Sequence, residues 1–242
     1  MKKILKKLIS KIISFFLGHE VSICPKSVED LVYNLNYKYG YSMTKLEQKP
    51  SDINNQELPW FTYPAIEYID QIDLRDKSVF EWGAGNSSIF FAKRSHKVIS
   101  IESNPEWHKV ISEKKLNNQE VFLKNEGDFV ESIEEFNQEF DIIIIDSLRR
   151  YECASKAITY LKEGGIIILD NSDWHPSTCK LLREFPKFIQ VDFHGFGPIN
   201  PYSWTTSFFI DREAIIKPLD NIQPHYSKAA IIQTSDHDGL II

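Results

Sequence analysis

Short apolar runs alternate with amphipathic segments between residues 77 and 170, and this alternation restricts the fold more than any other feature of the chain. The runs at 142–145 and 166–169 contain no polar residue, which is typical of parallel strands covered on both faces. The order of elements predicts a doubly wound α/β sheet. We expect strands at 77–82, 97–102, 120–124, 141–146 and 165–170, and helices at 87–93, 106–116 and 151–162.

The C-terminal part follows a different pattern. Residues 186–193 and 204–210 are strand-like, and the Gly- and Pro-rich stretch between them has no helical periodicity. Two strands joined by such a loop pair antiparallel, because a parallel crossover needs about a dozen residues and usually a helix. We therefore expect a Rossmann-like sheet of seven strands, mostly parallel and closed by a C-terminal antiparallel hairpin.

The segment before the sheet is expected to be mainly helical. Residues 27–39 and 64–72 have helical patterns, whereas 44–58 are polar and indicate a loop. The chain of 242 residues has an ordinary length for one α/β domain with additions. We expect three parts: a basic amphipathic helix (1–20), an N-terminal helical cap (21–76) and a ligand-binding domain (77–242).

Residues 1–17 contain five lysines and no acidic residue, which leaves 23 basic against 34 acidic residues, or a net charge of −11, for the rest of the chain. On a helix the five lysines fall on one half, and the other half carries Ile4, Leu5, Leu8, Ile9, Ile12, Phe15 and Phe16. This pattern is typical of a helix that lies on an anionic membrane surface. A helix docked on its own domain or on a second subunit fits the pattern equally well. No run reaches the ~18 apolar residues of a membrane span.

Composition excludes some classes of protein. The net charge of −6 and the pI near 5.7 argue against a protein that binds nucleic acid. Cys24, Cys153 and Cys179 lie far apart, which indicates reduced thiols rather than a disulfide framework or a zinc site. We expect a cytoplasmic protein, peripherally membrane-associated if residues 1–17 bind lipid. The sequence does not determine its oligomeric state.

The segment from Glu81 to Asn86 reads E-W-G-A-G-N and joins a predicted strand to a predicted helix. Its glycines allow a tight turn and a close approach to a ligand. Glu102 ends the next strand, 19 residues after Gly83, where an acidic side chain can bind ribose hydroxyls. A dinucleotide fingerprint would need a third glycine where Ser88 stands. Glu81 instead fits a ligand that carries an ammonium group.

This E-x-G-x-G pattern resembles the first motif of class I S-adenosylmethionine-dependent methyltransferases, and the closing hairpin resembles their sheet. The resemblance covers residues 77–210, including Gly127–Phe129, the strand ending at Asp146, and the turn at Leu161–Gly165. It implies that residues 77–242 bind S-adenosylmethionine, with Glu102 on the ribose and Asp128 near the adenine amino group. The implied cofactor-binding residues are Glu81, Gly83, Ala84, Gly85, Asn86, Glu102, Asp128 and Asp146.

Asp146 and Asp170-Asn171 end neighbouring predicted strands, so their oxygens are expected to converge. Such oxygens suit Mg²⁺, and the arrangement resembles metal-dependent O-methyltransferases that act on catechols and caffeoyl esters. Residues 147–151 depart from that family. The tail at 192–209 resembles small methyltransferases linked to cell-surface polysaccharide genes. Without a metal, Asp146 or His175 is the candidate general base.

Arg149 and Arg150 follow Asp146 and are candidate ligands for an anionic substrate; a solvated helical turn is the alternative. We expect methyl transfer from S-adenosylmethionine to an oxygen of a small molecule such as a sugar or nucleotide sugar. The alternatives are N- or protein methylation, an NAD-dependent oxidoreductase, and a non-catalytic cofactor- or membrane-binding module. Six aromatic side chains are candidates for the pocket wall: Trp60, Phe61, Tyr63, Trp174, Tyr202 and Trp204.

Overall fold

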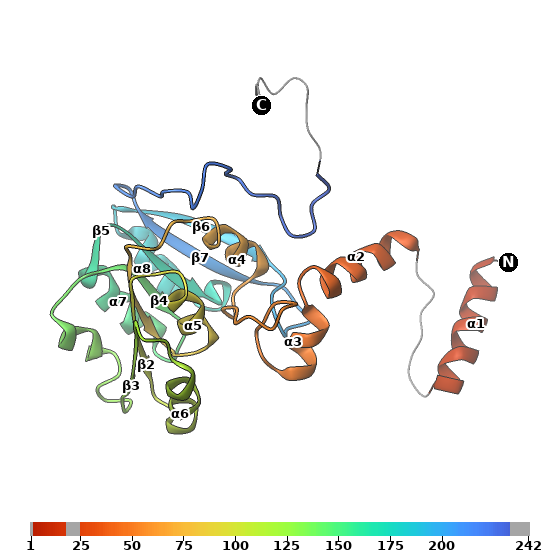
Figure 1. Cartoon of the computed structure of the whole chain (residues 1–242), viewed down its shortest axis with the longest axis horizontal. Coiled ribbons are helices and arrows are strands. Elements are labelled where there is room, and N and C mark those ends of the chain that lie inside the picture. The colour runs from red at the N-terminus through yellow and green to blue at the C-terminus, as the bar shows by residue number, and fades with distance from the viewer. Residues whose placement is uncertain (1, 18–24, 233–242) are drawn as a thin grey trace, which may run out of the picture.

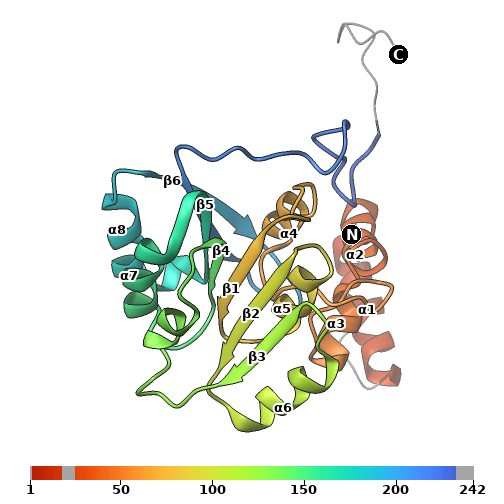
Figure 2. The ribbon, with the colours of Figure 1, turned by 60° about the vertical axis from the view of Figure 1, so that its left-hand side comes forward.

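The computed structural model describes residues 2–17 and 25–232, and its strands form one sheet in the order β3-β2-β1-β4-β5-β7-β6 (Figures 1 and 2). The strands are β1 (Ser78–Trp82), β2 (Lys97–Glu102), β3 (Gln119–Leu123), β4 (Phe140–Ile145), β5 (Leu161–Asp170), β6 (Phe188–Gly195) and β7 (Trp204–Asp211).

The first five strands pair in parallel, and β7 pairs antiparallel with both β5 and β6. Strand β6 therefore runs in the direction of the first five, and β7 is the reversed strand among the seven. The predicted fold class and the C-terminal hairpin are confirmed. The sequence did not show that β7, rather than β6, would lie next to β5.

Helices cover both faces of the sheet (Figure 2). Side chains alternate between the faces of a strand, so Ile142 and Ile144 pack with α4 (Tyr63–Ile69) and α5 (Asn86–Ala92). Ile143 and Ile145 lie in the opposite cluster, with residues of α7 (Arg150–Tyr160) and α8 (Pro176–Glu184). This two-sided burial explains the uninterrupted isoleucine run.

Helix α6 (Pro105–Lys114) begins where the sequence signals it. The Asn104 side chain accepts hydrogen bonds from the backbone N–H groups of Glu106 and Trp107, and Pro105 occupies the first helical turn. Both features favour a helix start, because the first turn has unpaired N–H groups and proline lacks one. Strand β2 and helix α6 are thereby joined by a short, well-defined turn.

Some elements differ from the prediction. Helix α3 (Tyr41–Glu47) overlaps the start of the predicted loop at 44–58, and the backbone N–H of Ile199 donates to the buried Thr44 hydroxyl at 2.9 Å. This long-range contact is invisible in the polar local composition. Strand β5 begins at Leu161 rather than at residue 165. The 3-10 helices η1 (Glu131–Phe136) and η2 (Ser172–Trp174) were also not predicted.

The chain returns to α4 after β7. The Gln71 carbonyl oxygen accepts a hydrogen bond from the Leu219 N–H at 2.7 Å, and Glu67 accepts one from the Lys228 N–H at 2.9 Å. At the other end, α1 (Lys2–Leu17) and α2 (Lys26–Tyr37) stand away from the sheet (Figure 1). None of the helices described is long and apolar enough to cross a membrane.

Candidate functional site

The turn after β1 lies at the carboxyl edge of the sheet, between the ends of β2 and β4. The Gly83 N–H donates to the Ile101 carbonyl at 2.9 Å, and the Asp146 N–H donates to the Trp82 carbonyl at 3.1 Å. Gly83 has a φ of +101°, and a Cβ there would lie 2.0 Å from the Asp146 carbonyl oxygen. Only glycine fits this position, so the motif brings bare backbone to the edge where open sheets bind ligands.

Glu81 is fully buried beneath this turn. Its Oε2 accepts hydrogen bonds from the hydroxyls of Ser88 and, at 3.0 Å, Ser100. Its Oε1 is buried and has no partner within the described part of the chain. Burial raises the pKa of Glu81 to about 7, although the serine hydroxyls oppose the shift. An unpartnered buried carboxylate oxygen is costly, and a bound cationic or hydrogen-bond-donating group would satisfy it.

Ser88 therefore has a positive role. Its hydroxyl also accepts a hydrogen bond from the Gly85 N–H at 3.0 Å, so it links the glycine turn to Glu81. The sequence showed Ser88 only as the place where a third glycine was missing. The contribution of Ser100 was not predicted; it lies in β2 directly beside Glu81 in the parallel register.

Glu102 is held at the end of β2. Its Oε1 accepts hydrogen bonds from the N–H groups of Ser103 at 2.8 Å and Asn104 at 2.7 Å, and burial raises its pKa. Trp107 connects the next helix to the glycine turn, because its indole N–H donates to the Ala84 carbonyl at 2.6 Å. The two predicted cofactor-binding segments are thus joined in one rigid unit.

Asp128 lies at the rim of this region. It is exposed, and one carboxylate oxygen accepts a hydrogen bond from the Asn125 side chain at 2.8 Å. The Trp82 indole N–H donates to the Phe129 carbonyl at 2.9 Å and so fixes this loop to β1. The adenine role of Asp128 stays a prediction.

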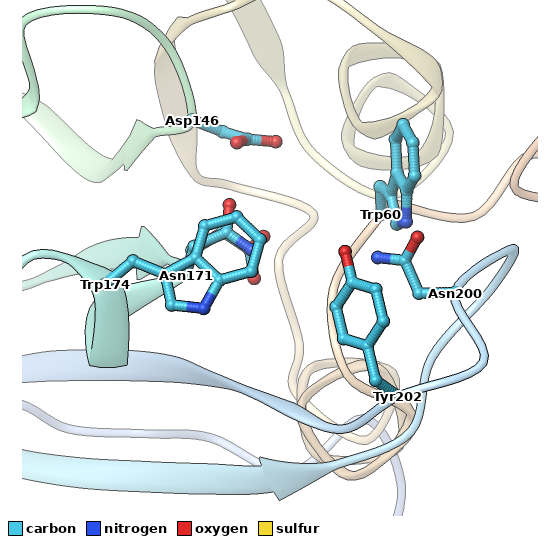
Figure 3. A pocket seen from close by; sticks show the side chains of 7 residues that line it. Trp60, Asp146, Asn171, Trp174, Asn200 and Tyr202 are labelled. Atoms are coloured by element: carbon cyan, nitrogen blue, oxygen red, sulfur yellow. The ribbon is translucent and has the colours of Figure 1, made fainter.

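A cavity of about 260 Å³ opens beyond Asp146. Trp60, Trp174 and Tyr202 line it as predicted, whereas Phe61, Tyr63 and Trp204 are buried in the core. Figure 3 shows Asp146, Asn171 and Trp174 on one side, facing Trp60, Asn200 and Tyr202 across the opening. Its lining residues are Trp60, Asp146, Asp170, Asn171, Trp174, Asn200 and Tyr202.

Asn200 was not among the predicted site residues. It lies between β6 and β7, in a loop with no periodic sequence pattern that could indicate where its side chain points. The neighbouring Tyr202 was considered only because it is aromatic.

The Arg150 guanidinium lies between the oxygens that were predicted to bind a metal. Its Nη2 donates to Asp146 Oδ1 at 2.7 Å and to Asn171 Oδ1 at 3.1 Å, and its Nη1 donates to the Ser147 carbonyl at 2.5 Å. Asp170 accepts hydrogen bonds from the Trp204 indole at 3.0 Å and the Thr206 hydroxyl at 2.6 Å. Burial, followed by the nearby Asp146 carboxylate, raises the pKa of Asp170 well above its usual value.

The predicted Mg²⁺ site at Asp146, Asp170 and Asn171 is not supported by this arrangement. Arg150 supplies the positive charge that a metal would bring, and Asp170 is engaged in bonds to β7. Throughout residues 2–17 and 25–232, no three His, Cys, Asp or Glu side chains form a group that could hold a metal ion.

The two arginines predicted to bind substrate have different surroundings. Arg149 is exposed, with its Nε 3.3 Å from Glu152 and its Nη1 donating to the Glu126 carbonyl at 3.0 Å. Arg150 is mostly buried in the ion pair with Asp146. From the sequence, both arginines were expected to bind substrate at the mouth of the site. In the structure, Arg149 faces solvent, whereas Arg150 pairs with Asp146 beside the cavity.

His175 begins α8 and does not line the cavity. Burial lowers its pKa, and the positive charge of Arg150 lowers it further. The imidazole is therefore neutral at pH 7 and able to accept a proton, but Asp146 lies closer to the cavity. Burial raises the pKa of Asp146, and the ion pair with Arg150 opposes that shift.

Comparison with known proteins gives matches of two kinds. Residues 80–172 match the sequence model of a methyltransferase domain family. A structure named as a candidate caffeoyl-CoA O-methyltransferase from Staphylococcus aureus has 16% identity, covers 77% of this chain and 100% of its own, and has a TM-score of 0.53. No protein with curated annotation matches the chain in sequence.

Two further structures have lower TM-scores. Precorrin-6y C5,15-methyltransferase from Geobacter metallireducens has 13% identity, coverage of 61% of this chain and 86% of its own, and a TM-score of 0.49. A candidate methyltransferase from Streptococcus mutans, solved with SAH, has 12% identity, coverage of 57% and 91%, and a TM-score of 0.45. The resemblance stated from the sequence is confirmed at the level of the fold: residues 80–172 match the methyltransferase domain model, and the seven-stranded sheet shares its fold with the Staphylococcus aureus structure.

Proposed function

We propose that this protein transfers a methyl group from S-adenosylmethionine to a hydroxyl oxygen of a small molecule, a sugar or a nucleotide sugar. The observation that carries the cofactor part is the buried Glu81 carboxylate with its unpartnered Oε1. It lies directly under the glycine turn, which brings backbone without side chains to the carboxyl edge of the sheet.

The described residues fit two parts of the cofactor, its ammonium group and its ribose. The Glu81 carboxylate would hold its ammonium group, and the Glu102 carboxylate, fixed by two backbone N–H groups, would accept hydrogen bonds from the ribose hydroxyls. Bound there, S-adenosylmethionine supplies an electrophilic methyl group on a sulfonium centre. The protein's contribution is then to exclude water and to hold the acceptor oxygen in line, since orientation contributes up to about 7–11 kcal/mol.

The cavity supports an acceptor that presents a hydroxyl-bearing sugar ring. Trp60, Trp174 and Tyr202 offer partly exposed aromatic surfaces, against which the C–H faces of a sugar ring can pack. Asn171 and Asn200 offer amide groups for its hydroxyls. Arg149 and Arg150 already bind protein groups. In this cavity the acceptor would therefore be bound mainly through its hydroxyls rather than through a phosphate.

Asp146 is the residue best placed to accept a proton from the acceptor. It lines the cavity, and Arg150 donates to its Oδ1, which favours the ionised carboxylate and opposes the effect of burial on its pKa. A hydrogen bond from the acceptor hydroxyl to the other oxygen would orient the attacking lone pair and receive the proton as the C–O bond forms. His175, neutral but outside the cavity lining, is the second candidate.

Calorimetry with S-adenosylhomocysteine and with NAD tests the cofactor. We expect binding of the first and none of the second; the reverse result would refute the proposal in favour of an oxidoreductase. The acceptor is tested by following S-adenosylhomocysteine release with separate sets of hydroxyl-bearing sugars, amines and peptides. Turnover confined to amines or peptides would refute the oxygen acceptor while leaving the methyltransferase intact.

A further inference from the structure

Helix α1 exposes two chemically different sets of side chains. Ile4, Leu5, Leu8 and Ile12 are 75%, 57%, 56% and 51% exposed. Lys6, Lys7 and Lys11 are also exposed, and the sequence of residues 1–17 contains no acidic residue. In a helix these apolar and basic sets fall on opposite halves. Such an extended apolar surface in water needs a partner to cover it.

Residues 25–232, the other part of the chain that the structure describes, do not provide that cover. Helix α1 stands away from the sheet and its flanking helices (Figure 1). Helix α2, which follows it, has no buried residue and exposes Val28, Leu31, Val32 and Tyr33. The domain packs its own core without either helix, since the buried residues of its two hydrophobic clusters, one on each face of the sheet, begin at Phe80 and at Leu58.

Length and charge restrict the kind of partner. With 16 residues, α1 is about 24 Å long, which is shorter than the ~30 Å hydrocarbon core of a bilayer. Five lysines would oppose insertion across that core. The same lysines complement an anionic lipid surface, whereas the remaining chain, at −11, is repelled by it. A helix lying in the membrane plane satisfies both halves of α1 together.

We propose that α1 binds the surface of an anionic lipid bilayer, with its apolar half among the acyl chains and its lysines at the headgroups. The acidic domain then stays on the aqueous side and is tethered by the helix. This places the methyltransferase domain at a membrane surface, and the inference is independent of the acceptor proposed above.

Vesicle flotation of the full chain tests the proposal, with phosphatidylcholine alone and with an equal mixture of phosphatidylcholine and phosphatidylglycerol. We expect flotation with the anionic vesicles and little with the neutral ones, weakening as salt increases. Each lysine near an anionic surface strengthens binding about fivefold. Triple reversal by Lys6→Glu, Lys7→Glu and Lys11→Glu should therefore weaken binding about a hundredfold or more.

Two further variants complete the experiment. Leu5→Ser with Leu8→Ser should abolish binding while leaving the thermal unfolding of the domain unchanged. The matched control is Lys38→Glu, Lys45→Glu and Lys109→Glu, three exposed lysines outside α1 with the same total charge change, which should retain most of the binding. Equal loss in the control, or no flotation of the wild type, overturns the proposal. A mass by ultracentrifugation that halves in the leucine variant, without flotation, would assign α1 to a dimer interface instead.

Discussion

Replacing Glu81 by glutamine should stabilise the ligand-free protein and weaken cofactor binding together. Glu81 is fully buried, and its pKa is raised from 4.5 to about 7. In the unfolded chain the carboxyl group titrates near 4.5, so between these values the folded protein keeps a proton that the unfolded chain has lost. Stability is therefore highest at low pH with respect to this group and falls as the pH rises through about 7.

The size of the effect follows from the shift. A displacement from 4.5 to about 7 corresponds to about 3 kcal/mol of destabilisation at pH 8. Glutamine has nearly the same shape, can accept from Ser88 and Ser100 through its carbonyl, and carries no charge to bury. For a chain of this length, Glu81→Gln should raise the apparent melting temperature by about 6–12 °C at pH 8. The difference should disappear near pH 4.5, where both side chains are neutral.

The affinity for S-adenosylhomocysteine should change in the opposite direction to the stability. Loss of a charge-assisted hydrogen bond of about 1.5–3 kcal/mol weakens S-adenosylhomocysteine binding about 10- to 150-fold. Wild-type affinity should rise with pH through about 7, as Glu81 ionises, whereas the affinity of the variant should stay level there. Thermal unfolding and calorimetry at both pH values measure this, with Glu113→Gln on α6 as an exposed control. A variant that melts lower than wild type at pH 8, or binds the ligand equally well, would refute this assignment for Glu81.

Three other changes test the geometry of the site. Gly83→Ala places a Cβ 2.0 Å from the Asp146 carbonyl oxygen, so urea unfolding should show a loss of about 2–4 kcal/mol, whereas Gly85→Ala, 3.5 Å from its nearest neighbour, should cost less than about 1 kcal/mol. Because the Arg150 guanidinium lies between Asp146 and Asn171, the wild type should show no Mn²⁺ binding by electron paramagnetic resonance and no loss of activity in EDTA; bound Mn²⁺ displacing Arg150 would contradict this. Trp60→Ala should raise the KM of the acceptor and leave S-adenosylhomocysteine affinity within about twofold, since Trp60 lines the cavity proposed for the acceptor.

The fold was predictable because its main determinants are local. The apolar runs of β4 and β5 are buried on both faces, and the caps and glycines that end the elements stand next to them in sequence. What failed depended on distant contacts. Helix α3 is held by the bond from Ile199 to Thr44, across 155 residues, and nothing in the polar sequence around Thr44 signals that contact.

The residues predicted to bind the cofactor lie close together for the same reason. Glu81 and Gly83 are two residues apart, and Glu102 ends the strand that pairs with β1. Their positions in the sequence are therefore enough to predict that they lie close together. The cavity proposed for the acceptor is lined by Trp60, Asn171, Asn200 and Tyr202, which come from three loops far apart in sequence. Residue type alone could select the aromatic candidates, and it selected as many core residues as pocket residues.

The charge balance at the ends of β4 and β5 shows why matching residue types did not determine the chemistry there. Two neighbouring carboxylates, Asp146 and Asp170, cannot both remain charged and unpaired in a partly buried edge. A metal ion is one way to neutralise them. Here Arg150, four residues after Asp146, pairs with the first carboxylate. A raised pKa favours the neutral form of the second, which accepts hydrogen bonds from Trp204 and Thr206. With both charges compensated from within the chain, little electrostatic attraction for Mg²⁺ is left. Arg150, which follows the motif, therefore decides against metal binding, although the motif's own residue types would favour it.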